Sequence, residues 1–344
     1  MTKRIEDDGA EGAQSRASLR ALVAGSLLTL AIFPALGVAA AQTAGFPDHP
    51  LKMIVGFSAG GGTDVAARLV AQAMSATLRQ SVVVENRPGA SGMLATADVA
   101  RAAPDGYTLL MGSQTTLAVA PALYRKFSID AARDFAGVAR AGASPLVLVV
   151  NPKFPAHSVA KLIALAKEKP GTLNFASGGI GTTPHMAGEL FAELAGIKLV
   201  HVAYRGEAPA LNDVLAGQIP MMFTNLSAAI GNIKAGSLRA LAVTGAQRSP
   251  SAPDIPTLAE AAIPDFAVET WFAVVAPART PRAIVARLNA EVQRGLAAPD
   301  IARRFADIGM SVGSGSPEEL DAYIKSEIAT WGQVIKSAGI RAPE

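Results

Sequence analysis

The chain has 344 residues, half of them hydrophobic, and a formal net charge of +3 at pH 7. A chain this long can bury substantial cores and is expected to form two domains, whereas a small, diffuse charge without a Lys/Arg-rich run argues against nucleic-acid binding. Cysteine is absent, which excludes disulfides, thiolate metal sites, cysteine nucleophiles and a lipoprotein anchor.

The amino terminus has the pattern of a signal peptide. Basic residues precede an apolar run over 21–40, and Ala39–Ala41 offers small residues for cleavage, so residues 1–41 are interpreted as a signal peptide. The run approaches the length of a membrane span, which makes a membrane anchor the alternative. Pro34 and Gly37 interrupt the run and favour cleavage. Acidic residues near the start fit a signal peptide poorly, which suggests a later start codon, and we expect secretion to the periplasm.

A glycine-rich loop, FSAGGGTD at 57–64, separates an apolar strand at 51–55 from an amphipathic helix that continues to Leu78. Thr63 or Asp64 is the expected N-cap. The first amides of a helix have no hydrogen-bond partner within the helix and carry the positive end of its dipole. Glycines leave these backbone amides accessible, so the loop can bind a carboxylate or phosphate. A tight turn that binds nothing explains the glycines equally well.

Strand and helix signals then alternate. Strands are predicted at 82–84 and 107–111, with a helix at 92–103 between them. The second strand leads into Ser113, Gln114 and Thr115. These polar side chains stand where a parallel strand ends and ligands commonly bind, although they could equally cap a helix.

Two extended passages are interpreted as crossings between domains. The first covers 134–150, as two extended pieces at 138–141 and 146–150 separated at 142–145, and the second covers 238–244. They predict a discontinuous domain 1, 42–143 plus 245–344, and a domain 2 at 144–244, joined by a hinge. Later elements predicted for domain 1 are a strand at 268–276, a helix at 281–296 and a last helix at 317–337, which begins at the capping box Ser316-Pro317-Glu318-Glu319.

Domain 2 contains a second glycine loop, SGGIGTTPH at 177–185, between a strand at 173–176 and a helix. Thr183 is the expected N-cap, with Pro184 at the first helical position. Two such helix ends, one in each half of the chain, predict a clamp for an anion. His185 either contacts ligand or water or is a satisfied structural histidine. Arg205 either binds a carboxylate through two hydrogen bonds or is a solvated residue.

Enzymatic motifs do not fit the chain. Neither glycine loop matches the P-loop or the dinucleotide-binding pattern, and no Gly-x-Ser-x-Gly elbow occurs. The four histidines are scattered without metal-ligand spacing. We therefore expect a protein that is not a catalyst, with no metal and no cofactor.

Several stretches together resemble the Bug family, the periplasmic receptors of tripartite tricarboxylate transporters. They are FSAGGGTD at 57–64, VVENRPGA at 83–90, APDGYTLL at 103–110, MMFTNL at 221–226 and LRALAVT at 238–244. The resemblance covers essentially the whole mature chain. It implies an α/β, two-domain periplasmic-binding-protein (Venus-flytrap) fold in which two crossing strands form the hinge and the two glycine loops face each other.

The resemblance also implies a function: capture of a small carboxylate in the interdomain cleft for the membrane permease subunits of a tripartite tricarboxylate-type transporter, by a monomer that binds no nucleic acid. A receptor that signals to a membrane sensor is the alternative, and an enzyme using the same cleft is less favoured. The expected ligand contacts are Phe57, Ser58, Ala59, Gly60, Gly61, Gly62, Thr63, Asp64, Ser113, Gln114, Thr115, Ser177, Gly178, Gly179, Gly181, Thr182, Thr183, His185, Tyr204 and Thr224. The family often has proline at positions 58 and 59 and aspartate at 224, so the departure at Thr224 leaves the ligand preference open.

Overall fold

The computed structural model describes residues 45–124 and 129–337. Contacts divide the chain into two units, 1–46 and 47–344, and every element below belongs to the second unit. The predicted signal peptide at 1–41 lies outside the described residues. Within the described ranges, none of the helices combines the length and the apolar character needed to cross a bilayer.

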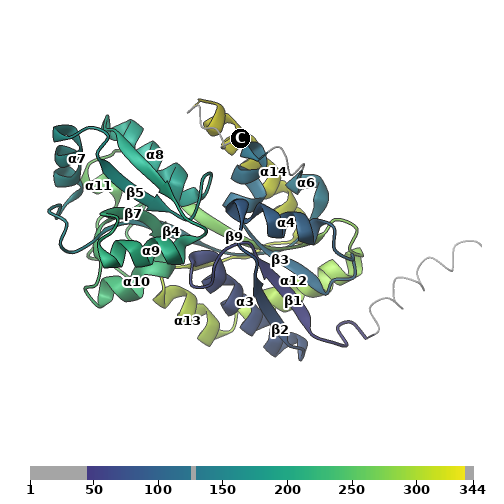
Figure 1. Ribbon diagram of the computed structural model, residues 1–344. Helices are drawn as coiled ribbons and strands as arrows, with labels where there is room; N and C mark the ends of the chain where they lie inside the picture. The colour runs from purple at the N-terminus through teal and green to yellow at the C-terminus, as the bar shows by residue number, and fades with distance from the viewer. Residues whose placement is uncertain (1–44, 125–128, 338–344) are drawn as a thin grey trace, which may run out of the picture. The chain divides into compact units, whose positions relative to one another are not determined.

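The first lobe is built on a sheet that we define by its strands (Figure 1). They are β1 (Leu51–Val55), β2 (Val82–Asn86), β3 (Thr108–Ser113), β9 (Glu269–Pro277), β10 (Ser311–Val312) and the first part of β4 (Phe135–Val150). Strand β1 runs parallel to β2 and β3, whereas β9 is antiparallel to both β3 and β4. The alternation of strands and helices at the start of the chain produces this parallel edge.

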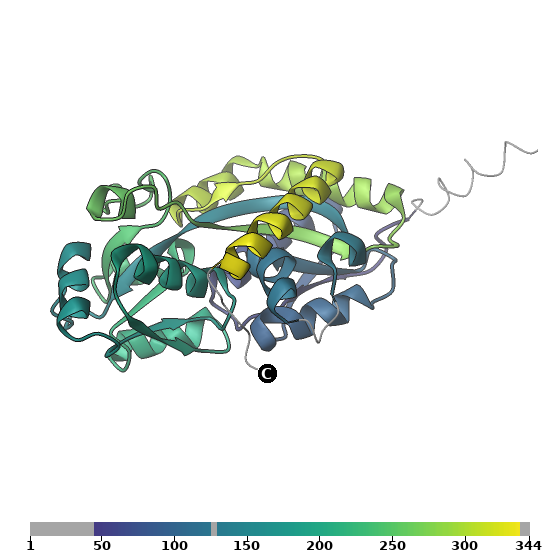
Figure 2. The ribbon, with the colours of Figure 1, turned by 90° about the horizontal axis from the view of Figure 1, so that it is seen from above.

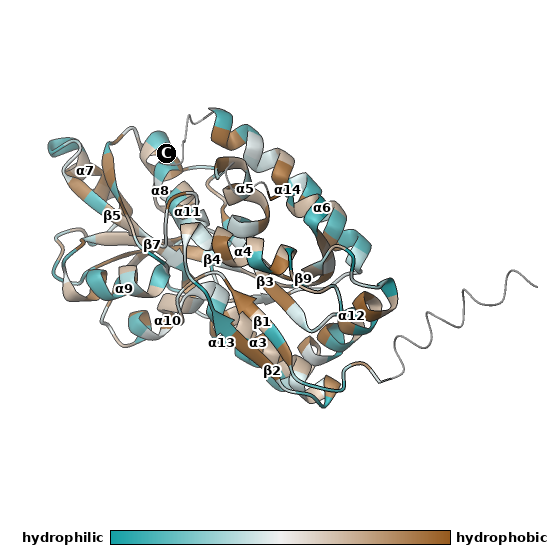
Figure 3. Ribbon diagram, turned by 45° about the vertical axis from the view of Figure 1, so that its right-hand side comes forward, coloured by the Kyte–Doolittle hydropathy of each residue, from teal (hydrophilic) through white to brown (hydrophobic). Residues whose placement is uncertain are grey.

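Helices cover both faces of this sheet, which explains why β1 and β3 are almost continuously apolar (Figure 3). Helices α3 (Gly62–Leu78) and α12 (Arg282–Leu296) pack together on one face. The other face carries α4 (Met93–Ala100), the π-helix η2 (Thr115–Val119) and α14 (Pro317–Ser337), whose Leu320 and Ile324 join the core around Trp271. The remaining elements are η1 (Ala90–Gly92), α5 (Ala120–Leu123), α6 (Ala131–Asp134) and α13 (Pro299–Asp307).

The second lobe has a sheet of its own. Its strands are β5 (Leu173–Ser177), β6 (Leu199–Ala203), β7 (Met221–Asn225), β8 (Arg239–Val243) and the second part of β4. Strand β5 is parallel to both β6 and β7. One face is covered by α7 (Val159–Glu168), α8 (Thr183–Ala195) and α11 (Leu258–Ala261), and the other by α9 (Glu207–Ala216) and α10 (Leu226–Lys234).

Strand β4 belongs to both lobes and forms the hinge together with the start of β9 (Figure 2). Its pairing with β9 extends to Pro145, and its pairing with β7 begins at Leu146. Thr244 joins the crossing strands: its hydroxyl donates to the Val268 carbonyl at 2.5 Å and accepts from the Leu146 amide at 2.8 Å. The predicted two-lobed α/β fold with crossing strands is confirmed.

Several local predictions differ from the structure. The extended passage at 134–150 was expected as two pieces separated at 142–145, and it is one 16-residue strand with two register shifts. Helix α13 was not predicted. The capping box at Ser316 is confirmed, since Ser316 and Glu319 bond each other's amides.

The predicted domain limits, 42–143 plus 245–344 and 144–244, stay a prediction. Leu258, Ile263 and Phe266 pack in the same core as Phe175 of the second lobe. Apolar side chains in one core fold together. We therefore propose that the return crossing lies at Val268–Glu269, later in the chain than 244/245.

The hinge makes a stability prediction. Replacing Thr244 with valine leaves the Leu146 amide and the Val268 carbonyl without this partner in a buried site, so we expect a loss of about 1–3 kcal/mol in the free energy of unfolding. Urea unfolding followed by circular dichroism measures it. Thr280→Val is the control, because the Thr280 hydroxyl is also buried but has no partner in the described residues. Equal losses in the two variants would contradict the role of Thr244.

Candidate functional site

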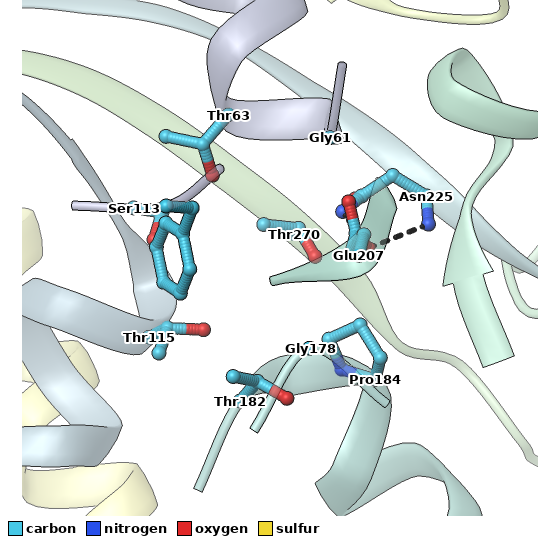
Figure 4. A pocket seen from close by; sticks show the side chains of 11 residues that line it. Gly61, Thr63, Ser113, Thr115, Gly178, Thr182, Pro184, Glu207, Asn225 and Thr270 are labelled. Atoms are coloured by element: carbon cyan, nitrogen blue, oxygen red, sulfur yellow. Dashed lines mark hydrogen bonds between the residues drawn. The ribbon is translucent and has the colours of Figure 1, made fainter. Parts of the chain in front are cut away.

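A cavity lies between the two lobes, at the carboxyl ends of strands from both sheets (Figure 4). Its cavity volume is about 20 Å³. Its lining residues are Phe57, Gly61, Thr63, Ser113, Thr115, Gly178, Thr182, Pro184, Glu207, Asn225 and Thr270. Room of this size holds about one water molecule, so the structure shows the lobes closed.

The first glycine loop is held by two acidic side chains. Helix α3 begins at Gly62 and its N-cap is Gly61, two or three residues earlier than predicted, and Gly61 has no side chain to act as a cap. Glu207 of the second lobe takes that role, because its carboxylate accepts the Gly62 amide at 2.7 Å. Asp64 accepts the Gly60 amide at 2.9 Å and closes the loop from inside the helix.

Asp64 is engaged within its own lobe and does not line the cavity. Burial alone would raise the pKa of its carboxyl, but hydrogen bonds from Arg68, from the Gly60 amide and from Asn86 outweigh burial and lower that pKa. The carboxylate therefore stays ionised and fixes the shape of the loop.

The second glycine loop is supported by two adjacent histidines, whose rings are tilted by 33° relative to each other. Helix α8 begins at Thr183, and its N-cap is Thr182, whose hydroxyl accepts the His185 amide; the prediction placed the cap one residue later. The His185 ring accepts the Gly181 amide through Nδ1 at 3.1 Å and lies 4.0 Å from the His201 ring, centroid to centroid. His185 is 6% exposed and does not line the cavity. Its contacts are those of a structural histidine.

Polar contacts across the lobes join the two loops. The Thr183 amide donates to the Thr115 hydroxyl at 3.1 Å, and the Thr183 hydroxyl donates to Gln114 Oε1 at 3.0 Å. Gln114 in turn donates to Glu327 of α14 at 3.1 Å. On the neighbouring side, Ser91 donates to the Ile180 carbonyl at 2.6 Å. The end of α8 is therefore partly satisfied by side chains of the first lobe.

The lobes approach so closely that residue size matters. A Cβ atom built on Gly62 would lie 2.6 Å from Cβ and Cγ of Asn225 in the other lobe. Contacts that short do not occur, so any side chain at Gly62 would force the lobes apart. A glycine is required here by the close approach itself, independently of any turn conformation.

The structure brings together part of the predicted contact set. Phe57, Gly61, Thr63, Ser113, Thr115, Gly178 and Thr182 line the cavity, while Gly179 and Tyr204 line a second hollow that shares Phe57 and Gly178 with it. The other predicted contacts, which do not line the cavity, are Ser58, Ala59, Gly60, Gly62, Asp64, Gln114, Ser177, Gly181, Thr183, His185 and Thr224.

Two individual predictions need further comment. The Tyr204 hydroxyl donates to Asp213 at 2.5 Å, and burial followed by this bond raises the pKa of Tyr204 to about 12. Arg205, left open between a carboxylate fork and a solvated position, is exposed and lines the second hollow.

Sequence reasoning missed four lining residues: Pro184, Glu207, Asn225 and Thr270. Asn225 and Glu207 stand one and three residues beyond the predicted contacts Thr224 and Tyr204, at the ends of further strands of the second lobe. The rule that ligands meet the carboxyl ends of parallel strands could have found both. Thr270 lies on the hinge strand β9, and no sequence motif identifies this strand as part of a binding site.

Three cavity-lining side chains present buried polar atoms without a hydrogen-bond partner in the described residues: Ser113 Oγ, Asn225 Oδ1 and Thr270 Oγ1. Buried polar atoms are nearly always bonded, so these three are available to a polar ligand or to water in the cavity. The lining contains no Lys, Arg or His. Over the described ranges, no cluster of three or more potential metal ligands is found.

Comparisons with known proteins show the family of the chain. A sequence profile of the tripartite tricarboxylate transporter family receptor matches residues 66–340. The chain is 37% identical to Protein BugT of Bordetella pertussis over 318 residues, which cover 92% of this chain and 98% of BugT.

Solved structures of periplasmic binding proteins are also similar to this chain. The periplasmic binding protein BugD is 34% identical with a TM-score of 0.83, over 86% of this chain and 99% of BugD. The R. palustris protein Rpa4515 with adipate is 37% identical with a TM-score of 0.83, over 86% and 99% of the two chains. MatC from Rhodopseudomonas palustris with bound malate is 34% identical with a TM-score of 0.80, over 84% and 100%.

The histidine pair beside the second loop predicts a pH effect. Burial, followed by the charge of His185, lowers the pKa of His201 from 6.5 to about 3. Between these values the unfolded chain binds a proton that the folded chain does not. The free energy of unfolding therefore falls as the pH drops below 6.5, by at most about 1.4 kcal/mol per pH unit.

Urea unfolding between pH 4 and 8 measures this slope. We expect His201→Gln to be less dependent on pH than the wild type, while the control His157→Gln, at an exposed position, keeps the wild-type slope. A His201→Gln variant with the wild-type slope would contradict the assignment.

Proposed function

The chain belongs to the tripartite tricarboxylate transporter receptor family, and from that premise we propose that it is a periplasmic receptor that captures a small organic acid between its lobes and presents it to the membrane permease of such a transporter. The members of this family are solute-binding proteins, not enzymes. Part of the proposal is that residues 1–41 are a cleaved signal peptide that directs the chain to the periplasm.

One observation carries the proposal: the closed cavity is lined by hydroxyls and helix ends, with no cationic side chain. The hydroxyls of Thr63 and Ser113 can donate to a carboxylate, and the amino-terminal dipoles of α3 and α8 favour negative charge beside them. The solved relatives with adipate and malate support a carboxylate as the class of ligand.

Entry and release need movement about the hinge. The closed cavity has room for about one water molecule, so an organic acid can enter only after the lobes separate. The lobes then close around the acid, with a wider cavity than the one described above. Residues of both lobes contact the acid at once, and these contacts exist only when the lobes are closed. Such differential contacts shift the population toward closure, and the closed form is the one presented to the permease.

A thermal-shift panel of mono-, di- and aromatic carboxylates tests binding. A ligand at about 100 times its dissociation constant adds roughly 2.7 kcal/mol to stability, which gives a clear increase in melting temperature. Hits are measured by calorimetry, and uptake of the labelled hit by cells with and without the receptor tests transport. No stabilisation by any carboxylate would refute the proposal.

Gly61→Val should weaken ligand binding at least a hundredfold while the protein stays folded. Gly61 has an extended backbone (φ −79°, ψ 168°) that valine accepts, but the added side chain would press on Glu207, whose Oε2 and Cβ lie 3.3 and 3.4 Å from an added Cβ. Calorimetry measures binding and circular dichroism checks the fold. The matched control is Gly231→Val, where an added Cβ meets nothing within 4 Å. Wild-type affinity in Gly61→Val would contradict the site.

Closure should also be visible in tryptophan fluorescence. The only two tryptophans, Trp271 and Trp331, both donate to Glu327, which also receives the Gln114 bond that leads to Thr183 in the other lobe. We expect a saturating ligand to change the emission. Gln114→Leu should reduce that change and lower affinity about tenfold, because it removes a contact made only on closure.

The control for this measurement is Gln72→Leu, at an exposed position on α3. It should retain both the wild-type affinity and the wild-type change in emission. An unaltered response in Gln114→Leu would show that the tryptophans do not sense closure through this link.

A further inference from the structure

Glu207 is a buried carboxylate in the wall of the cavity. It is the first residue of α9 in the second lobe and is 9% exposed. Its Oε2 accepts the Gly62 amide of the first lobe at 2.7 Å, and its Oε1 accepts both the amide and the side-chain nitrogen of Asn225, at 3.0 and 2.7 Å. The proposed ligand would meet this carboxylate inside the closed site (Figure 4).

The bonds of Glu207 favour its ionised form. Each carboxylate oxygen accepts a backbone N–H, and a third N–H comes from the Asn225 side chain. An ionised carboxylate accepts such bonds more strongly than a neutral carboxyl group does. Burial raises the pKa of Glu207 above its ordinary value, and the hydrogen bonds from Gly62 and Asn225 reduce that rise without reversing it. The three N–H donors and the positive end of the α3 dipole favour a negative charge on Glu207 at the end of α3, where a carboxylate from outside would otherwise bind.

The polar groups of the cavity consequently divide into two ends. At one end stand the Ser113 hydroxyl and the end of α8, which suit an incoming carboxylate. At the other end stand Glu207 and the unpartnered Oδ1 of Asn225, which is 3% exposed and accepts only. Its orientation follows from the bond that Asn225 Nδ2 donates to Glu207.

We propose that Glu207 determines specificity, so that the site selects an organic acid with one carboxylate and a hydrogen-bond donor, such as a primary amide, hydroxyl or ammonium group, at its far end, and rejects dicarboxylates. The inference rests on the proposed function of this cavity. A second carboxylate at the far end would stand near the Glu207 charge and would find two acceptors in place of donors.

The size of the discrimination follows from Coulomb's law. Two like charges about 5 Å apart, at the effective dielectric constant typical of protein sites, disfavour binding about a hundredfold. A monoamide has nearly the shape of the corresponding diacid, but its amide group donates two hydrogen bonds and carries no charge. Matched pairs of diacid and monoamide therefore isolate the charge.

The experiment measures the affinity of the full mature protein for succinate and succinamate, glutarate and glutaramate, and adipate and adipamate by calorimetry at pH 7.5. We expect the wild type to prefer the monoamide of the best-fitting pair by about a hundredfold. Glu207→Gln should reduce that preference to threefold or less, because the buried charge is gone. Glu168→Gln, which removes one charge at an exposed position on α7, should keep the full preference.

The outcomes separate this inference from the proposed function. If the wild type binds diacids as tightly as monoamides, or if Glu207→Gln keeps the wild-type preference, the role of Glu207 is overturned while the receptor function stands. If no carboxylate of any kind binds the wild type, both fail together. Should Glu207→Gln not fold by circular dichroism, Glu207→Ser serves as the second variant, and the wild-type pairs alone still decide whether dicarboxylates are rejected.

Discussion

The structure depends on two helix ends that the fold brings to one cavity and whose first amides need acceptors from outside the helical hydrogen-bond pattern. Parallel strands deliver α3 and α8 with their amino termini toward the same space, and no Lys, Arg or His lines it. Each free amide in a closed site needs an acceptor, because water is excluded on closure. The chain supplies some of these acceptors itself: Glu207 for Gly62 and Thr115 for Thr183. A ligand can bond only to the polar groups that the chain itself leaves without partners.

Closure and binding are therefore parts of one network. The bonds of Thr183 to Thr115 and Gln114 form across the lobes, and Gln114 is held by Glu327 together with both tryptophans. The hinge, where β4 changes from one sheet to the other beside Thr244, needs only small rotations to break these contacts. Because the interlobe bonds are few and polar, water can replace them when the lobes open, so a ligand that bridges the lobes can decide which form is populated.

Much of the fold could be read from the sequence, because hydrophobic periodicity and the two glycine loops identify strand-loop-helix units directly. The sequence also predicted seven of the eleven residues that line the cavity, including Thr63, Ser113 and Thr182. Other features could not be predicted from local sequence patterns. Gly61 lacks a cap of its own, and the acceptor comes from Glu207, 145 residues away from Gly62. A bond at that separation depends on how the lobes meet, which no local pattern records. The packing of Leu258 and Phe266 in the second lobe was missed for the same reason.

Glu207 also changes how the closed form should be understood. In a clamp with two empty helix ends, a ligand carboxylate is the negative charge that holds both lobes, and closure without ligand leaves buried amides unpaired. Here a carboxylate of the second lobe already bonds the first lobe at Gly62, so part of that cost is removed before any ligand arrives. A ligand can add to closure only through groups that Glu207 leaves unsatisfied, chiefly Ser113, Thr270 and the Asn225 oxygen. Affinity and selectivity then come from the same few atoms, because a guest that cannot pair with them gains nothing from closure to offset its own desolvation.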